Sequence, residues 1–360
     1  MIRMFLHPSR VLPVLILLAL VWSCSMLIRI SSRSGLPLAL TYPPASRPRF
    51  HLLIPISSPN LAFCRCLKTA LINGYSPVLI NWMQDSGSEI KNKLAKITGV
   101  GNYISKHIEN DSDLILTTDG FDVWFQQSFE VVIEYYYSKP DRQIVFGSDK
   151  LCYPYIEGPM CDEVPKSPMP SDVYGSNLDT DHIYTRPRWL NAGVILGTRK
   201  YLNPLYQEAL RKKIDMEKAD QKVFTELYHS GKWGINLDFW SELTFSLGWS
   251  VHEAVQMPDY YYSVRSEDVV LGRLKIPRRP LVWSLLTGTC PPIVHFPGDS
   301  REKFYTMWYP SWVGKFDKKI TEQIAQQKIS TDDGKFVTFE SICGQIERDT
   351  WAADQLRDSS

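Results

Sequence analysis

Short apolar runs alternate with longer amphipathic segments in the first half of the sequence, and this alternation constrains the fold more than any other feature. Residues 51–56 have the pattern of a buried strand, residues 61–72 that of a helix, and residues 77–82 that of a second strand. A helix over 88–109 and a strand over 113–117 repeat the order. Strand, helix and strand at this spacing are typical of parallel pairing. We therefore predict an α/β fold with a doubly wound, mostly parallel sheet flanked by helices.

The same pattern continues, interrupted by one long irregular segment. Residues 152–188 are rich in Pro and Asp and show little periodicity, and such a loop within a compact domain is usually functional or mobile. The further expected elements are a helix at 128–137, strands at 143–147 and 189–197, and helices at 204–216 and 220–229.

The N-terminus contains an uncharged run of 18 residues, 11–28, with Arg3 and Arg10 before it. At about 1.5 Å per residue it covers most of a ~30 Å hydrocarbon core. We predict a single-pass type II signal-anchor in the Golgi or endoplasmic reticulum membrane with a lumenal catalytic domain; a cleaved signal peptide remains the alternative. The predicted organisation is a cytoplasmic tail at 1–10, a transmembrane signal-anchor at 11–28, a stem at 29–48, a globular domain at 49–316 and a polar tail at 317–360.

Cysteines and a glycosylation sequon agree with entry into the secretory pathway. Six of the seven cysteines lie outside the uncharged run, an even number that suits an oxidising compartment. Cys152 and Cys161 bracket a short loop containing Pro and Gly, and we expect them to form a disulfide, while the pairing of the others stays open. Asn110, Asp111 and Ser112 form an N-glycosylation sequon.

The charge balance excludes one class of function. Forty basic and 39 acidic side chains leave a formal net charge of +1, without the basic excess of a nucleic-acid-binding protein. The chain has 11 Trp and 18 Tyr. Their aromatic faces suit sugar rings and nucleobases, although most such side chains belong to protein cores.

Two acids, Asp119 and Asp122, flank a Gly-Phe pair at the carboxyl end of a predicted strand. Ligands bind at these strand ends in open α/β sheets. With no adjacent Lys or Arg in the sequence, two carboxylates repel unless a cation lies between them, and hard oxygen ligands favour Mg²⁺ or Mn²⁺. Such a metal can clamp a diphosphate. An ordinary Asp-Gly turn is the alternative, and the Asp-x-Asp triplets at 111–113 and 179–181 are weaker metal-site candidates because of their positions before the strand and in the irregular segment.

Residues 114–124, Leu-Ile-Leu-Thr-Thr-Asp-Gly-Phe-Asp-Val-Trp, resemble the strand and Asp-x-x-Asp motif in the glycosyltransferase domain of the collagen lysyl hydroxylases, the procollagen galactosyl- and glucosyltransferases. Four further segments follow in the order of that family. They are a strand and Tyr-Pro loop at 145–154, an Asn-Ala-Gly strand at 190–197, an Asp-Gln helix start at 219–221 and a terminal histidine at 295.

The resemblance implies a GT-A fold, a UDP-sugar donor and Mn²⁺ or Mg²⁺ held by Asp119, Asp122 and His295. Taken alone, His295 reads as a core histidine. The residues expected to contact the nucleotide are Phe121 in place of a uracil-stacking Tyr, Thr118, Lys93 with Lys91 as second choice, Gly298 and Arg301. Asn191 and Asp220 are expected to contact the sugar and act in catalysis, although they could instead cap a strand and a helix. Phe296 and Pro297 interrupt the family's His-Gly-x-Gly ending.

These features predict a metal-dependent glycosyltransferase that moves a sugar from a UDP-sugar to a glycan or protein acceptor. A glycogenin-like GT-A transferase shares the motif order, but its Asp-x-Asp spacing differs from Asp-x-x-Asp. A catalytically inactive lectin or scaffold of the secretory pathway is the alternative from another class, and it would lack metal-dependent nucleotide binding.

Overall fold

The computed structural model of the protein describes residues 48–358 except 140, 156, 176–181, 213–219 and 258–279. The uncharged run at 11–28 and the Asp-x-Asp triplet at 179–181 lie outside these residues. No helix in the described part of the chain has both the length and the apolar character needed to cross a membrane.

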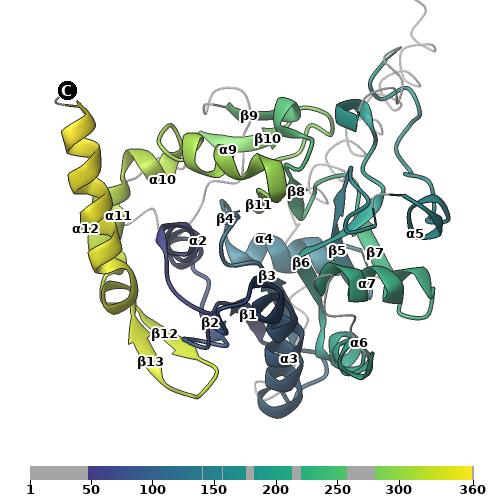
Figure 1. The fold of residues 1–360 in the computed structure, drawn as a ribbon, viewed down its shortest axis with the longest axis horizontal. Coiled ribbons are helices and arrows are strands. Elements are labelled where there is room, and N and C mark those ends of the chain that lie inside the picture. Colours follow the sequence, from purple (N-terminus) through teal and green to yellow (C-terminus); the bar gives the residue numbers. More distant parts are fainter. Residues whose placement is uncertain are drawn as a thin grey trace, which may run out of the picture. The chain divides into compact units, whose positions relative to one another are not determined.

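An eight-stranded sheet lies at the centre of residues 48–358, with the strand order β13-β12-β2-β1-β3-β6-β5-β7 (Figure 1). Its strands are β1 (Phe50–Pro55), β2 (Pro77–Ile80), β3 (Leu114–Thr118), β5 (Ile144–Asp149), β6 (Trp189–Thr198), β7 (Ile235–Asp238), β12 (Lys328–Thr331) and β13 (Phe336–Thr338). β1 pairs in parallel with β2 and β3, as expected from the strand-helix-strand pattern.

The sheet is mixed but mostly parallel, as predicted: β6 and β13 run opposite to the other six of its eight strands. β6 runs antiparallel to both of its neighbours, β3 and β5. A parallel return would need a crossover, usually a helix packed on the sheet. The described residues between β5 and β6 contain only the four-residue helix α5 (Pro159–Asp162) and a short 3₁₀ turn (His182–Tyr184), so the chain re-enters the sheet in the opposite direction.

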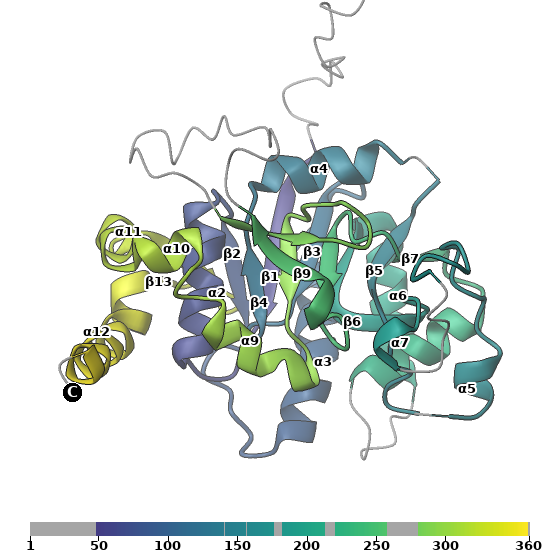
Figure 2. The same ribbon diagram turned by 90° about the horizontal axis from the view of Figure 1, so that it is seen from above.

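Helices cover both faces of the sheet, as the doubly wound prediction required (Figure 2). α3 (Glu89–His107), α6 (Arg199–Arg211) and α7 (Asp220–His229) bury their apolar residues in a core on one face. The other face packs against α2 (Leu61–Ile72), α4 (Phe129–Tyr137) and a small sheet. That small sheet has the order β4-β11-β8 and consists of β4 (Val123–Phe125), β8 (Thr244–Ser246) and β11 (Ile293–His295).

Several short elements follow the main α/β unit. β9 (Ala254–Met257) and β10 (Leu281–Ser284) form an antiparallel pair. α9 (Arg301–Thr306), α10 (Trp312–Lys315) and α11 (Asp317–Ile324) come after β11. The last helix is α12 (Phe339–Asp358).

The segment predicted to be a polar tail is part of the main sheet, which corrects the boundary at residue 317. β12 lies in parallel beside β2, pairing Thr331 with Leu79. Sequence patterns missed it because β12 is only four residues long and begins with an exposed lysine. A four-residue strand is too short for alternation to stand out from a polar background.

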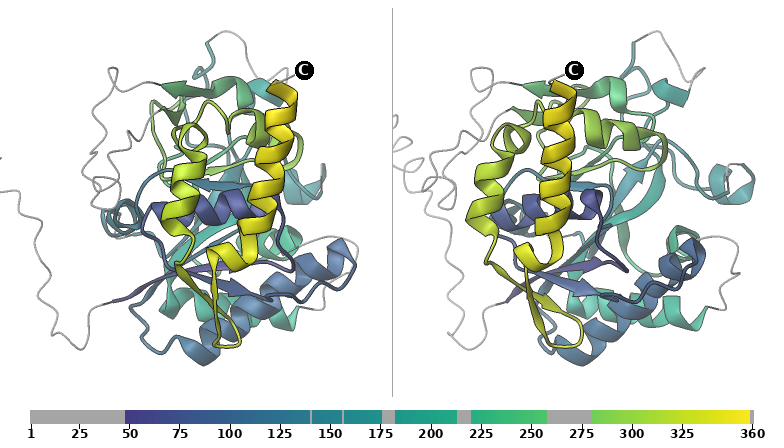
Figure 3. Two further views of the ribbon diagram at one scale, coloured as in Figure 1. Left: turned by 90° about the vertical axis from the view of Figure 1, so that its left-hand side faces the viewer. Right: turned by 60° about the vertical axis from the view of Figure 1, so that its left-hand side comes forward.

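α12 lies beside α2 (Figure 3), and a group of residues that we call the C-terminal clasp fastens the two helices together. It consists of the Cys64–Cys343 disulfide and an ion cluster in which the fully buried Lys68 contacts Asp317 and Glu347. The Lys68 Nζ lies 2.8 Å from the Glu347 Oε2. The clasp thus joins α2, the first helix of the described residues, to α12, the last.

The expected Cys152–Cys161 disulfide is present. Of the described cysteines, Cys66 and Cys290 form no disulfide. Asn110 of the sequon is exposed in the turn before β3, where a glycan has room.

Candidate functional site

Three strands deliver Asp119, Asp122 and His295 to one point. Asp119 follows β3, Asp122 precedes β4, and His295 ends β11, where it pairs with Val123 of β4. Backbone hydrogen bonds fix both acids, since the Asp119 N–H donates to the Gly193 carbonyl and the Phe296 N–H to the Asp122 carbonyl, each at 2.8 Å. One ligand atom from each of the three side chains lies within 4.8 Å of the other two.

Two atoms at this point are buried without a hydrogen-bond partner. The Asp122 Oδ1 and the His295 Nε2 lie 3.5 Å apart, and neither has a partner among the described residues. Leaving a buried polar group unsatisfied costs about 1–3 kcal/mol. Carboxylate oxygens and an imidazole nitrogen that converge in this way suit a divalent cation such as Mn²⁺, so the residues present fit a metal.

Neighbouring charges shift the pKa values of these groups. Burial raises the pKa of Asp119 even though the Lys96 ammonium opposes it. Burial also acts to raise the pKa of Asp122, but His295, Lys96 and Arg301 together hold it below its ordinary value. For His295, burial acts to lower the pKa, yet the surrounding carboxylates raise it. A bound cation reverses this last effect because it competes with the proton for the imidazole nitrogen.

A lysine contacts the acids, which corrects the expectation that no basic group lies beside them. The ammonium of Lys96 forms an ion pair with Asp119 and lies 3.3 Å from Asp220 Oδ2. Lys93, the expected phosphate contact, also lines the cavity, whereas Lys91 is exposed and does not. Lys93 and Lys96 are three residues apart on α3 and so share a face. The positions of these lysines in the sequence do not show that they lie near Asp119, because α3 approaches this acid only in the folded protein.

Asp149 was missed by the sequence analysis, although the same argument finds it. It ends β5, is 7% exposed, and accepts a 3.0 Å hydrogen bond from the Asn191 side-chain amide. The Asn191 Oδ1 in turn accepts from the Gly193 N–H at 2.9 Å. Burial raises the pKa of Asp149, with Asn191 acting against it. Asn191 therefore orients a third strand-end acid and does more than cap a strand.

Gly193 makes room for the histidine. A Cβ at this position would lie 2.2 Å from Cε1 and 2.6 Å from Nε2 of His295. Any larger side chain would displace the imidazole. The glycine of the Asn-Ala-Gly strand is therefore required by the approach of β11 to β6.

A cavity of about 340 Å³ opens over these groups, within the size range of small-ligand sites. Five acids and three basic residues line it, which leaves an excess of negative charge that a divalent cation would balance. The charged lining residues are Asp119, Asp122, Asp149, Asp220, Asp299, Lys93, Lys96 and Arg301. Asn191 and Gly298, both expected at the site, also line it, and Tyr153 and Trp249 contribute aromatic side chains.

Two of the expected nucleotide contacts are not on the cavity wall. Phe121 packs against the hydrophobic core. Thr118 borders a gap of about 20 Å³ beneath the site, next to Asp119 and Asp220, and its buried hydroxyl has no partner among the described residues. Their roles stay predictions.

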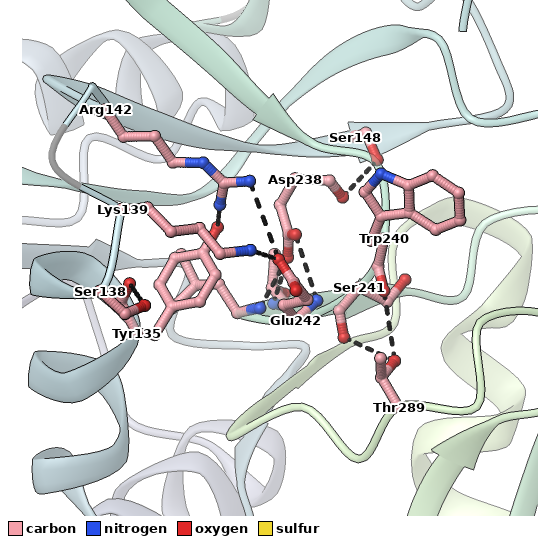
Figure 4. A network of polar contacts seen from close by, with 12 residues as sticks. Tyr135, Ser138, Lys139, Arg142, Ser148, Asp238, Trp240, Ser241, Glu242 and Thr289 are labelled. Atoms are coloured by element: carbon pink, nitrogen blue, oxygen red, sulfur yellow. Dashed lines mark hydrogen bonds and ion pairs between the residues drawn. The ribbon is translucent and has the colours of Figure 1, made fainter. Parts of the chain in front are cut away.

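The loop between β7 and β8 is held by a polar network (Figure 4). The buried Asp238 carboxylate accepts hydrogen bonds from the N–H groups of Glu242, Leu243 and Thr244 at 3.1, 2.7 and 2.9 Å. Glu242 also forms an ion pair with Lys139. Because Thr244 begins β8 and β8 pairs with β11, this network helps to set the position of His295.

The chain carries a glycosyltransferase domain. Residues 59–167, just under a third of the sequence, match the family model described as the PLOD GT domain, the collagen lysyl hydroxylase glycosyltransferase domain. The resemblance seen in the sequence motifs is thereby confirmed over a segment that contains Lys96, Asp119, Asp122 and Asp149. No curated protein matches the sequence.

Solved structures similar to this chain include two glycosyltransferases. One, involved in glycosylation of the major capsid of the virus PBCV-1, is 11% identical with a TM-score of 0.39, covering 72% of this chain and 99% of its own. Mouse xyloside xylosyltransferase 1 is 10% identical with a TM-score of 0.36, covering 71% and 99%. A 4-diphosphocytidyl-2C-methyl-D-erythritol synthase from Anaerococcus prevotii is 13% identical with a TM-score of 0.30, covering 53% and 88%.

Proposed function

We propose that the protein transfers a sugar from a UDP-sugar to an acceptor hydroxyl with the help of Mn²⁺ or Mg²⁺. The observation that carries this proposal is the convergence of Asp119, Asp122 and His295, two of which bury unpartnered ligand atoms facing each other. Glycosyl transfer releases a nucleoside diphosphate, and a divalent cation at these residues would supply the Lewis acidity that stabilises the leaving charge.

The remaining lining residues divide by charge. Lys93, Lys96 and Arg301 can offset the negative charge of the phosphates. Arg301 has its guanidinium 3.7 Å from the Asp122 carboxylate, so it lies beside the metal position.

The sugar is assigned to neutral and acidic side chains of the same cavity. Asn191 can donate hydrogen bonds to its hydroxyls and accept from them, Asp220 can accept from them, and Asp149, linked to Asn191, is a third candidate.

A binding experiment tests the function directly. With Mn²⁺ present, UDP is expected to raise the melting temperature and to bind in a calorimetric titration, whereas UDP alone binds weakly. A panel of other nucleoside diphosphates serves as the comparison. If no nucleoside diphosphate binds in the presence of Mn²⁺, the protein is a catalytically inactive scaffold and not an enzyme. Hydrolysis of a series of UDP-sugars then identifies the donor.

We also propose that the catalytic domain is lumenal and anchored in the Golgi or endoplasmic reticulum membrane by residues 11–28. The uncharged run, the two disulfides and the exposed sequon support this. In sealed microsomes, a C-terminal tag is expected to resist protease until detergent is added. Digestion of the tag without detergent would show that the membrane orientation is the reverse of the one proposed.

A further inference from the structure

A second hollow lies between α2, α9 and α12. It is a groove of about 910 Å³, and we refer to it as the α12 groove. The side chains that matter here are Arg65 of α2, Tyr305 of α9, Tyr309 just after α9, and Asp349 and Asp354 of α12. None of these residues lines the catalytic cavity.

The groove contains a buried cation with an unused donor. Arg65 is 3% exposed, and its Nη1 has no hydrogen-bond partner among the described residues. Its guanidinium carbon lies 5.3 Å from the ring centroid of Tyr305, 4.8 Å from that of Trp308 and 5.5 Å from that of Tyr309. Aromatic rings stabilise the charge, but they leave the N–H without a true acceptor. A ligand oxygen would supply one.

The walls add aromatic faces and acceptors. Tyr305 and Tyr309 are 42% and 49% exposed. The Tyr309 hydroxyl donates to the Asp354 carboxylate at 3.2 Å, and Asp349 brings a second carboxylate to the groove. The α12 groove therefore combines ring faces, hydrogen-bond acceptors and one donor with mixed charge.

This combination suits a neutral sugar. Asp349 and Asp354 would repel an anionic ligand, whereas a neutral sugar can donate hydroxyl hydrogen bonds to their carboxylates. Its ring has an apolar C–H face that can lie on a tyrosine, and its hydroxyls both donate and accept hydrogen bonds.

The α12 groove also adjoins the catalytic cavity along one helix. Arg301 at the start of α9 lines the cavity, and Tyr305 on the same helix lines the groove. Four residues correspond to one helical turn, about 6 Å of rise, so both side chains project from the same side of α9. A chain of sugars in the groove thus lies one turn of helix from the place where transfer would occur.

We propose that the α12 groove binds the glycan part of the acceptor, a neutral oligosaccharide stacked on Tyr305 and Tyr309 and hydrogen-bonded to Arg65, Asp349 and Asp354. The inference rests on the proposed function only in naming this ligand an acceptor. Binding of the oligosaccharide itself requires neither metal nor nucleotide.

The test uses the full-length chain in detergent on an array of printed neutral, sialylated and sulfated oligosaccharides, without metal or UDP. The wild-type protein is expected to bind neutral oligosaccharides. Tyr305→Ala with Tyr309→Ala should weaken that binding about tenfold or more through loss of two ring faces. Asp354→Asn should weaken it less. The matched control is Phe336→Ala, which removes an even more exposed aromatic side chain, 66% exposed, from β13.

A calorimetric titration of the same variants with UDP and Mn²⁺ separates this inference from the proposed function. UDP affinity is expected to be unchanged in the tyrosine variants. If the wild-type protein binds no neutral oligosaccharide, prefers charged ones, or binds them equally well after both tyrosines are removed, the inference is wrong, whatever the UDP titration shows. Absence of UDP binding together with tyrosine-dependent oligosaccharide binding would overturn the enzyme and leave the groove as a lectin site.

Discussion

The metal-site residues and the C-terminal clasp use similar side chains for opposite purposes. In each, a lysine contacts two carboxylates: Lys96 contacts Asp119 and Asp220, and Lys68 contacts Asp317 and Glu347. Lys68 is fully buried, whereas the Lys96 side chain is 24% exposed at the edge of an open cavity.

The difference is where the balancing charge comes from. In the clasp, Lys68 neutralises the acids from inside, with Arg65 adding a further positive charge near Glu347 and the Trp351 indole donating to Asp317 at 2.7 Å. In the cavity the acids outnumber the bases, so no side chain of the cavity balances the excess negative charge. A cluster that is neutralised by its own chain supports the fold, whereas one with an unbalanced charge is prepared for a ligand.

The largest expected effect is the loss of binding when a cavity acid is removed. Asp119→Ala or Asp122→Ala should abolish Mn²⁺-dependent UDP binding while the protein stays folded, because each would supply a ligand oxygen to the same cation. Calorimetric titration measures the loss, and thermal unfolding checks the fold. Asp333→Ala removes an exposed acid from the turn before β13 and serves as the control. Unchanged UDP affinity in both cavity variants would end the metal-site assignment.

Lys68→Met should have the opposite profile, with lower stability and intact binding. It leaves two acids near each other without their cation, one of them buried, and breaking a buried ion pair in this way typically costs about 3–5 kcal/mol. Denaturant unfolding measures the cost.

Acidification tests the cause of that loss. Burial raises the pKa of Glu347 and Lys68 opposes the rise, so removing the lysine lets it rise further. The folded state of the variant then binds a proton more readily than the unfolded state, and its stability should partly recover as pH falls through the raised pKa. If Lys68→Met also weakened the binding of UDP, the clasp and the metal site would not be independent.

A smaller effect is expected from the histidine. His295→Ala should raise the Mn²⁺ requirement on the order of 10-fold by removing one of three protein ligands. Gly193→Ala should do the same by displacing the imidazole. Gly101→Ala is a suitable glycine control, because it meets only side-chain atoms of Leu210 and Tyr206 at 3.1 Å or more. If only the melting temperature of His295→Ala falls, the residue is a core histidine and the cation is held without it.

The smallest expected effect is a change in affinity that has opposite signs for Mn²⁺ and for UDP. Lys96→Met removes positive charge beside Asp119, so Mn²⁺ alone should bind a few-fold tighter while UDP in the presence of Mn²⁺ binds a few-fold more weakly. Lys93→Met, which removes a second lysine from the same cavity, should also weaken the binding of UDP. Weaker binding of both ligands in Lys96→Met would mean that the lysine positions Asp119 and does not compete with the cation.

Local patterns predicted the elements that bury one apolar face. Helix α2 begins at the expected residue because Asn60 caps it, accepting from the Phe63 N–H at 2.9 Å. The meeting of Asp119, Asp122 and His295 was also predictable, since the first two follow a strand and the motif order of the resemblance supplied the third.

What sequence could not supply was long-range pairing. The Cys64–Cys343 disulfide joins residues 279 apart in sequence, and no local pattern selects that pair from the alternatives. The antiparallel direction of β6 depends on how an irregular connection returns to the sheet. The sequence motifs favoured Lys93 and did not single out Lys96. Only the packing of α3 on the sheet decides which lysine of one helix face contacts Asp119.

The position of β12 has a consequence for how the protein is made. A chain growing from its N-terminus has β2 and Cys64 long before it has the strand and the cysteine that complete them. At about 5–20 residues per second, the 279 residues that separate the two cysteines take on the order of tens of seconds to synthesise. Throughout that interval the outer side of β2 lacks its partner strand and Cys64 lacks its disulfide partner. The last few dozen residues are therefore required to complete the fold, because a chain truncated before them lacks the strand that pairs with the outer side of β2.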